Sequence, residues 1–286
     1  MLRAALLCLA LAPAAAPAQD AGALLARHTA LQKQLADNPF GRPLHVESTA
    51  DGARHKGEVH AVIDVPYSVA GPALARPAHW CDILTLQVNV KSCNASDQTI
   101  SALITRKPRD RVDSAHRIDF RFHAAVTSAQ YLQVALNSES GPVGTRDYEI
   151  RLEAAPLDAG RTFIRMSYAY TLGTMARWAM DAYLAGSGSD KVGFSVVERL
   201  PDGRPVYVDG VRGVVERSAM RYYLAIAATV ESLSLPAAQR LDARLRSWYA
   251  AITSYPQLRE QVGADEYVEM KRREASLPPV TAPAAG

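Results

Sequence analysis

Residues 57–171 alternate apolar and polar positions with a period of two. Side chains on a strand point to its two faces in turn, so each alternating run predicts a strand with one covered face and one solvated face. This pattern is typical of antiparallel sheets, and the short connections favour a meander. The segment therefore predicts one curved antiparallel sheet, with strands at 59–65, 84–90, 100–104, 118–124, 132–136, 148–154 and 164–170.

Helical spacing appears on both sides of this segment. Apolar residues recur at helical intervals over 22–36, and Asn38-Pro39 ends that helix. The longest unbroken apolar stripe runs over 213–233 and predicts a long amphipathic helix. Two further helices are predicted after it, one from Pro236 and one over about 256–274.

Two interruptions separate these regular elements. The Pro- and Ala-rich stretch 66–80 predicts one or two short helices within the sheet region. Between the sheet and the long helix, the pattern predicts a short helix at 175–184, a strand at 192–196 and an extended edge at 205–208.

The first residues have the pattern of a secretory signal peptide. Arg3 supplies a positive charge, residues 4–12 are apolar, and Ala16-Pro17-Ala18 provides a small-residue cleavage site. The apolar run is too short to span a bilayer. We expect cleavage near Ala18 and a soluble, periplasmic or secreted chain without a transmembrane segment.

The patterns divide the 286 residues into five parts. The formal charge of +3 falls by one when Arg3 is removed with the leader, and so small an excess gives no reason to expect a nucleic-acid partner. The expected parts are a signal peptide at 1–18, an N-terminal helix at 19–43, a sheet-and-helix domain at 44–234 with an insertion at 172–211, a helical extension at 235–275 and a disordered tail at 276–286.

Two cysteines, Cys81 and Cys93, lie beyond the predicted leader. An exported chain with an even number of cysteines usually pairs them, so we expect a structural disulfide. Two buried free thiols are the alternative. All seven histidines precede residue 124 and none forms a recognisable ligand set, so we expect no metal site and no other cofactor. No sequence motif names a reaction, and the catalytic residues, if any, stay unknown.

The order of elements resembles the START-like helix-grip superfamily, which includes lipid-transfer domains and polyketide cyclases. The residues that carry the resemblance are the strand pattern 57–171, the interruption 66–80 and the long helix 213–233. The resemblance covers roughly 45–234. It implies an α+β fold in which a curved sheet grips the long C-terminal helix and leaves a cavity between them. The insertion and the extra C-terminal helices depart from this pattern.

Tyrosines concentrate on the surfaces that would line such a cavity. A cavity with apolar walls and a few hydroxyl groups suits a lipid, a sterol-like compound or an aromatic acid. A satisfied aromatic core is the alternative; for Trp80 it is packing beside the disulfide, and for Arg221 a surface charge paired with Glu216 or another acid. The candidate ligand-binding residues are Tyr148, Met166, Tyr168, Tyr170 and Tyr222, with Trp80 at the cavity mouth and Arg221 facing a ligand carboxylate.

These observations favour an exported binding or carrier protein for a hydrophobic small molecule. One alternative is a cofactor-independent enzyme of the cyclase or hydratase type, in which a tyrosine hydroxyl works with Glu149 or Asp82. The other is a structural envelope protein with a filled core.

Overall fold

The computed structural model describes residues 16–141, 144–186, 188, 191–260 and 262–277. Residues 1–15, which hold most of the predicted leader, lie outside the described residues, as do residues 278–286 of the predicted tail. The expected division into domains stays a prediction.

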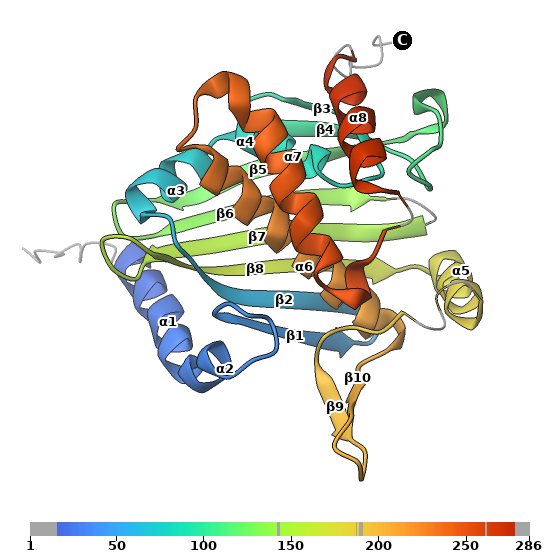
Figure 1. Ribbon diagram of the computed structural model, residues 1–286, viewed down its shortest axis with the longest axis horizontal. Helices are drawn as coiled ribbons and strands as arrows, with labels where there is room; N and C mark the ends of the chain where they lie inside the picture. Colours follow the sequence, from blue (N-terminus) through green and yellow to red (C-terminus); the bar gives the residue numbers. More distant parts are fainter. Residues whose placement is uncertain (1–15, 142–143, 187, 189–190, 261, 278–286) are drawn as a thin grey trace, which may run out of the picture.

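One eight-stranded sheet dominates the molecule, and all of its neighbouring strands are antiparallel. Its strand order is β1-β2-β8-β7-β6-β5-β4-β3, so β3 to β8 form the predicted meander and β2 returns to pair with β8 (Figure 1). The strands are β1 (Leu44–Asp51), β2 (Arg54–Ile63), β3 (Val90–Ala95), β4 (Thr99–Ile104), β5 (His116–Thr127), β6 (Leu132–Ser140), β7 (Thr145–Pro156) and β8 (Thr162–Leu172).

Helices pack on both faces of the sheet. The long helix α6 crosses β1, β2 and β8 on the face that we call the inner face, and α7 packs on α6. The helices are α1 (Ala16–Ala30), α2 (Gln32–Ala36), α3 (Tyr67–Leu74), α4 (Pro77–Thr85), α5 (Thr174–Ala185), α6 (Gly210–Ser232), α7 (Ala237–Thr253) and α8 (Ala264–Ala275), with a small hairpin of β9 (Val196–Arg199) and β10 (Pro205–Tyr207).

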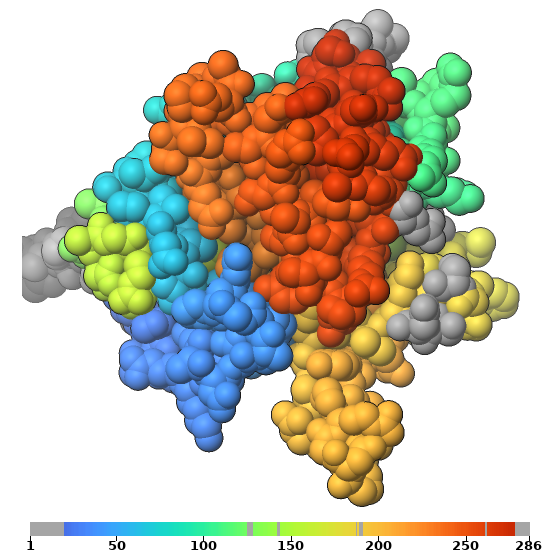
Figure 2. All heavy atoms as spheres, viewed as in Figure 1, coloured from blue at the N-terminus to red at the C-terminus, as the bar shows by residue number. Residues whose placement is uncertain are grey.

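The alternation seen in the sequence builds the main core on the inner face. Ile164 and Met166 of β8 are completely buried there, as are Ala219 and Ile226 of α6. The C-terminal segment, orange to red in Figure 2, covers most of this side of the molecule, and the β9–β10 hairpin projects from its edge. The prediction of an α+β fold with a curved antiparallel sheet gripping a long helix is confirmed.

The outer face carries a second, smaller core under α1. Leu24 and Leu31 pack there with Val62 of β2 and Phe163 of β8, which alternate with the inner-face residues of the same strands. The ring of His28 adds an edge contact to Phe163 with 4.9 Å between centroids. The N-terminal helix is therefore part of the packed structure.

Three local expectations were wrong or incomplete. The predicted strand over 84–90 is wrong except for Val90, because α4 continues to Thr85, a turn follows, and β3 begins only at Val90. The helix buries Trp80, Ile83 and Leu84 at helical spacing. The strand expected over 192–196 begins only at Val196. The edge strand β1 was not predicted as a strand, although it pairs with β2 along its whole length.

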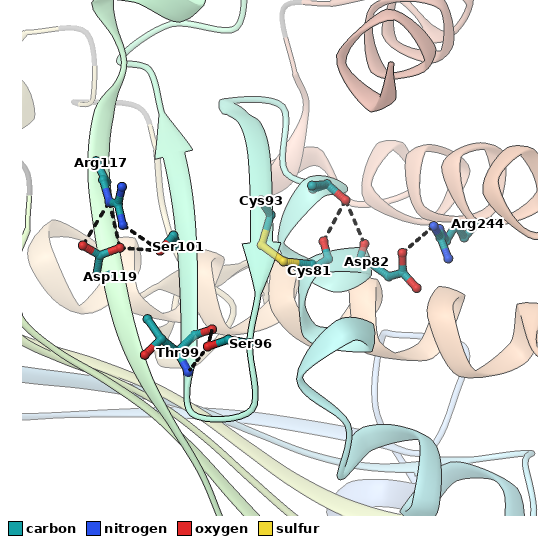
Figure 3. Close-up of a disulfide and its surroundings, with 10 residues drawn as sticks. Cys81, Asp82, Cys93, Ser96, Thr99, Ser101, Arg117, Asp119 and Arg244 are labelled. Carbon is teal, nitrogen blue, oxygen red and sulfur yellow. Dashed lines mark hydrogen bonds and ion pairs between the residues drawn. A yellow bond between two sulfur atoms is a disulfide. The ribbon is translucent and has the colours of Figure 1, made fainter. Parts of the chain in front are cut away.

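The predicted disulfide is present. The Sγ atoms of Cys81 in α4 and Cys93 in β3 are bonded, with the two Cα atoms 5.4 Å apart (Figure 3). Next to it, Asp82 accepts a hydrogen bond of 2.6 Å from Arg244 of α7. The disulfide thus links α4 to the edge strand β3, and the adjacent hydrogen bond links α4 to α7 of the C-terminal extension.

Candidate functional site

Four tyrosines from three elements meet between α6 and the inner face of the sheet. Tyr168 stacks on Tyr222 with ring centroids 5.4 Å apart, and Tyr148 stacks on Tyr170 at 5.5 Å. Edge contacts of 6.0 Å and 5.8 Å join Tyr168 to Tyr148 and to Tyr170. We call these four residues the phenol cluster.

The local sequence explains why these side chains converge. Tyr168 and Tyr170 are two residues apart on β8, so they point to the same face of the sheet. Tyr148 lies near the start of neighbouring β7, which pairs with the end of β8 that leads into α5. Tyr222 comes from the side of α6 that faces β8. The structure thus brings together four of the predicted site residues.

The phenol cluster is largely removed from solvent, although three of its four residues keep some solvent exposure. Tyr148, Tyr168 and Tyr222 are partly buried, and Tyr170 is 3% exposed. Burial is the main cause that raises the pKa of all four phenols. Each phenol is therefore protonated at neutral pH and can donate a hydrogen bond.

The hydroxyl groups of the cluster differ in their partners. The hydroxyl of Tyr148 lies 2.9 Å from Thr145 Oγ1. The hydroxyl of Tyr170 is buried and has no hydrogen-bond partner among the described residues. A buried hydroxyl without a partner costs free energy. The Tyr170 hydroxyl therefore lacks a hydrogen bond that a bound ligand or water could supply.

The other predicted site residues lie differently. Met166 is fully buried beneath α6. Trp80 is also fully buried, and its indole N–H donates to the Leu74 carbonyl at 2.8 Å. Arg221 donates through Nε to Glu260 at 3.0 Å, so an acid of the chain, though not Glu216, already pairs with it. Their roles in ligand binding stay predictions.

Two charged residues of α6, Glu216 and Arg217, are buried. Glu216 is completely buried and Arg217 is 4% exposed. The Glu216 carboxylate accepts hydrogen bonds from the backbone amides of Phe194 and Ser195, at 2.6 and 2.9 Å, and from the Ser48 hydroxyl at 2.6 Å. Both carboxylate oxygens of Glu216 are therefore satisfied by hydrogen bonds, and Arg212 in turn donates to the Ser48 hydroxyl at 3.2 Å.

Arg217 has a different environment from its neighbour. Its NH1 atom donates to the carbonyls of Lys191 and Val192, at 2.6 and 3.0 Å. Burial and the like charge of Arg221 lower the pKa of Arg217, while the nearby phenols, above all Tyr183 through a hydrogen bond, raise it. The side of α6 that carries Glu216 and Arg217 is covered by residues 191–195, which the sequence pattern did not bring to this place.

Several cavities lie outside the phenol cluster, two of them beside distinctive side chains. One of about 770 Å³ lies beside the aromatic trio Phe40, Phe194 and Tyr255, whose rings meet edge to face. Another of about 320 Å³ borders the disulfide and is lined in part by the buried amines of Lys91 and Lys271. Both amines donate hydrogen bonds to Glu274 and to backbone carbonyls. These partners within the chain account for the two buried lysines without a ligand.

The carboxylates considered for acid–base catalysis lie away from the phenol cluster. Glu149 follows Tyr148 on β7 and pairs with Arg54 and Arg151. Asp82 lies beside the disulfide and pairs with Arg244. Neither carboxylate faces the tyrosine hydroxyls that a cyclase or hydratase would need beside it.

Within the described ranges, no three His, Cys, Asp or Glu side chains are grouped so that they could hold a metal ion. No helix in the described part of the chain is long and apolar enough to cross a bilayer.

Comparisons with known proteins gave only distant structural likenesses. No family model matches the chain, and no curated protein matches it. Among solved structures, the chain is similar to Zhui aromatase/cyclase from Streptomyces sp. R1128, with 14% identity over 68% of this chain and 98% of that one and a TM-score of 0.37. It is also similar to Ara h 8.0201, with 13% identity over 66% and 99% of the two chains and a TM-score of 0.35.

A third likeness is to a START superfamily protein from Mycobacterium smegmatis, with 11% identity over 50% of this chain and 88% of that one and a TM-score of 0.32. The description of the fold rests on the chain's own topology: a meander closed by β2 beside β8, two short helices between β2 and β3, and α6 laid across the inner face. By this arrangement of elements, the chain has a START-like helix-grip fold.

Proposed function

We propose that this protein is an exported carrier that binds a hydrophobic small molecule, such as a lipid, a sterol-like compound or an aromatic compound, at the phenol cluster. The observation that carries the proposal is that four tyrosines gather between α6 and the inner face, three of them only partly buried and one, Tyr170, with a buried hydroxyl that has no partner among the described residues. Aromatic walls with a few hydroxyl groups are typical of sites for such ligands.

The composition of the cluster supports binding over simple core packing. Elsewhere on the inner face, β8 and α6 place Ile164, Met166 and Ile226, which are fully buried and carry no hydroxyl. At the end of the sheet beside α5 the same strand places Tyr168 and Tyr170 instead. A filled core at this position would favour side chains without a hydroxyl, because each buried hydroxyl needs a partner.

Export is supported by two independent features. The N-terminal residues have the pattern of a secretory leader. The Cys81–Cys93 bond requires an oxidising compartment to persist. Expression of the full chain in a bacterial host, followed by N-terminal sequencing of the periplasmic fraction, should give a mature chain starting at Gln19; recovery of the uncleaved chain in the cytoplasm would contradict export.

Ligand titration tests the binding proposal directly. The chain starting at Gln19 is titrated with a fluorescent fatty acid, a fluorescent sterol and a naphthalene derivative. Tyr168→Leu should weaken binding of the preferred probe about tenfold, because it removes a ring that stacks on Tyr222. Tyr168→Phe, which keeps the ring, should bind much more nearly like the unmodified protein.

The matched control is Tyr131→Phe, because Tyr131 lies in the outer-face core and its hydroxyl bonds to Glu153. This variant should bind every probe as the unmodified protein does. Absence of binding by all three probes would overturn the proposal and favour an aromatic core.

A further inference from the structure

The cavity of about 770 Å³ lies where three segments that are distant in the sequence meet. Phe40 follows α2, Phe194 belongs to the connection before β9, and Tyr255 follows α7. Figure 2 shows these segments, in blue, gold and orange-red, meeting on one face of the molecule. We call this space the junction cavity. None of the four phenol-cluster residues lines it, so it is a separate place from the proposed ligand site.

One wall of the junction cavity is aromatic. The rings of Phe40, Phe194 and Tyr255 meet edge to face, with centroids 5.8, 6.0 and 6.1 Å apart. Phe194 is only 5% exposed, whereas Phe40 and Tyr255 are partly buried. Tyr207 of β10 adds a fourth ring to the lining. Part of this aromatic surface therefore stays available to a ligand.

Two exposed cations, Lys191 and Arg259, also line the junction cavity. Within the described residues, no carboxylate oxygen lies within 4.0 Å of the side-chain nitrogens of either one. The Lys191 amine lies 5.7 Å from the centre of the Tyr183 ring, which is an uncharged partner. The described lining holds no Asp or Glu. The charge at this cavity is therefore positive and complements an anion.

Two buried charges hold the wall that residues 191–195 contribute. The Glu216 carboxylate accepts hydrogen bonds from the backbone amides of residues 194 and 195, at 2.6 and 2.9 Å. The Arg217 guanidinium donates to the backbone carbonyls of residues 191 and 192, at 2.6 and 3.0 Å. These bonds fix the backbone of the wall in the absence of a ligand. A wall that is ordered beforehand favours binding, because less conformational entropy is lost when the ligand arrives.

The size and chemistry of the junction cavity fit a small organic anion. Sites for small molecules commonly measure about 300–1,000 Å³ and combine apolar walls with a few polar groups. A ligand with a ring system would place it against Phe40 and Tyr255. A guanidinium such as that of Arg259 suits a carboxylate or a phosphate, and a lysine amine binds either group as a point charge.

We propose that the junction cavity is a second binding site, which takes a small aromatic anion that carries a carboxylate or a phosphate. The site is built from the N-terminal segment, the insertion before α6 and the C-terminal extension, which all lie outside the sheet and its gripped helix. It goes beyond the proposed function and does not depend on binding at the phenol cluster.

Three probes with one ring system test the proposal. 2-Naphthoate and 2-naphthyl phosphate are anions at neutral pH, whereas 2-naphthalenemethanol is uncharged. Isothermal titration calorimetry is done on the chain starting at Gln19 and on its Tyr168→Leu variant, in which the phenol cluster is weakened. At least one anion should bind both proteins about tenfold more tightly than the alcohol, because charge-assisted hydrogen bonds are the stronger kind. The tighter anion identifies the charged group of the ligand.

Variants in the lining locate the site. Lys191→Gln/Arg259→Gln removes two exposed charges and should lower the affinity for the anion to that for the alcohol. Ser254→Trp places a large side chain at an exposed position of the lining and should weaken binding of the anion about tenfold with both cations still present. Lys33→Gln/Arg246→Gln is the control, because it removes the same charge from exposed positions outside the cavity. Circular dichroism checks that each variant is folded.

The outcomes separate this proposal from the proposed function. Equal binding of anions and alcohol, or a preference for the anion that survives Lys191→Gln/Arg259→Gln, would overturn the second site and leave the proposed function standing. Loss of the preference in Tyr168→Leu alone would assign the anion to the phenol cluster and also overturn the second site. Binding of fatty acid and sterol probes should be the same in the Lys191→Gln/Arg259→Gln variant and in the unmodified protein.

Discussion

Gly57 of β2 lies directly against the backbone of Val215 in α6. A Cβ atom on Gly57 would be 2.3 Å from the Val215 carbonyl oxygen, a distance that no side chain can accept without movement of the helix or the strand. Glycine at this position therefore sets how closely α6 approaches the sheet. The contact lies immediately before Glu216 and Arg217, so it also sets the position of both buried charges.

Gly57→Ala should destabilise the protein by about 2 kcal/mol or more, because the added methyl group forces strand and helix apart. Urea unfolding followed by circular dichroism measures the change. Gly22→Ala is the matched control: it lies in α1 with nothing within 4 Å of its Cβ position, and it should be neutral or slightly stabilising. Equal stability of the Gly57 variant and the unmodified protein would contradict the close contact.

Glu216→Gln should cost about 2 kcal/mol of unfolding free energy. The carboxylate accepts from three donors. An amide of the same size loses the charge of the carboxylate and replaces one acceptor oxygen by an N–H donor, which forces the Ser48 hydroxyl to reverse its hydrogen bond or meets the backbone amides. Thermal or urea unfolding gives the difference. Glu198→Gln, at an exposed position of β9, should have no measurable effect. A neutral result at Glu216 would show that these three hydrogen bonds contribute little.

Loss of the Cys81–Cys93 bond should lower stability by about 3 kcal/mol on the chain-entropy model, since the bond closes a short loop between residues 12 apart in sequence. The Cys81→Ser/Cys93→Ser double variant is compared with the oxidised protein in urea. Added reductant should lower the stability of the unmodified protein and leave the double variant unchanged. Two free thiols in the non-reduced protein would contradict the pairing.

The burial of His60 should make the folded protein less stable in mild acid. The residue is 1% exposed, and burial lowers its pKa from 6.5 to about 4. The unfolded chain thus binds a proton below pH 6.5 that the folded protein takes up only near pH 4, so stability is full above pH 6.5 and falls as the pH drops through this window. The loss is at most about 3 kcal/mol.

Urea unfolding at several pH values between 4 and 7 tests this dependence. His60→Asn should flatten the profile, although His28 and His55, whose pKa burial also lowers, keep part of it. His116→Asn, at an exposed position of β5, should leave the profile as it was. An identical pH dependence with and without His60 would sink the prediction.

The elements with one covered face were predictable from the sequence. Along most of β7 apolar residues alternate with polar ones, because one face packs against the main core and the other is more open. The alternation is weaker in β8, where Phe163 on the outer face is buried in the second core under α1. β1 was missed because most of its positions, including His45 and Glu47, are polar and its last residues are exposed. The stretch around Leu84 fits both periods, and only its packing in α4 decides between them.

The phenol cluster could be predicted because its residues lie on apolar faces that the pattern defines. The burial of Arg217 could not, because a helical stripe shows only which side of α6 meets the sheet. Residues 191–195 cover another side of the helix, and a connection far from it in sequence leaves no periodic signal there. The pairing of Arg221 with Glu260 is equally long-range.

The pairing of β2 with β8 has a consequence for the order in which the chain folds. The hairpin of β1 and β2 forms from local contacts, yet its place in the sheet exists only after β8 has been made, because Arg54 pairs opposite Thr171. Until then both β2 and the growing meander present an unpaired edge. Pairing between distant segments is slow and leaves such edges open to other chains. We therefore expect the intact chain to refold slowly, with aggregation as the competing reaction at high concentration.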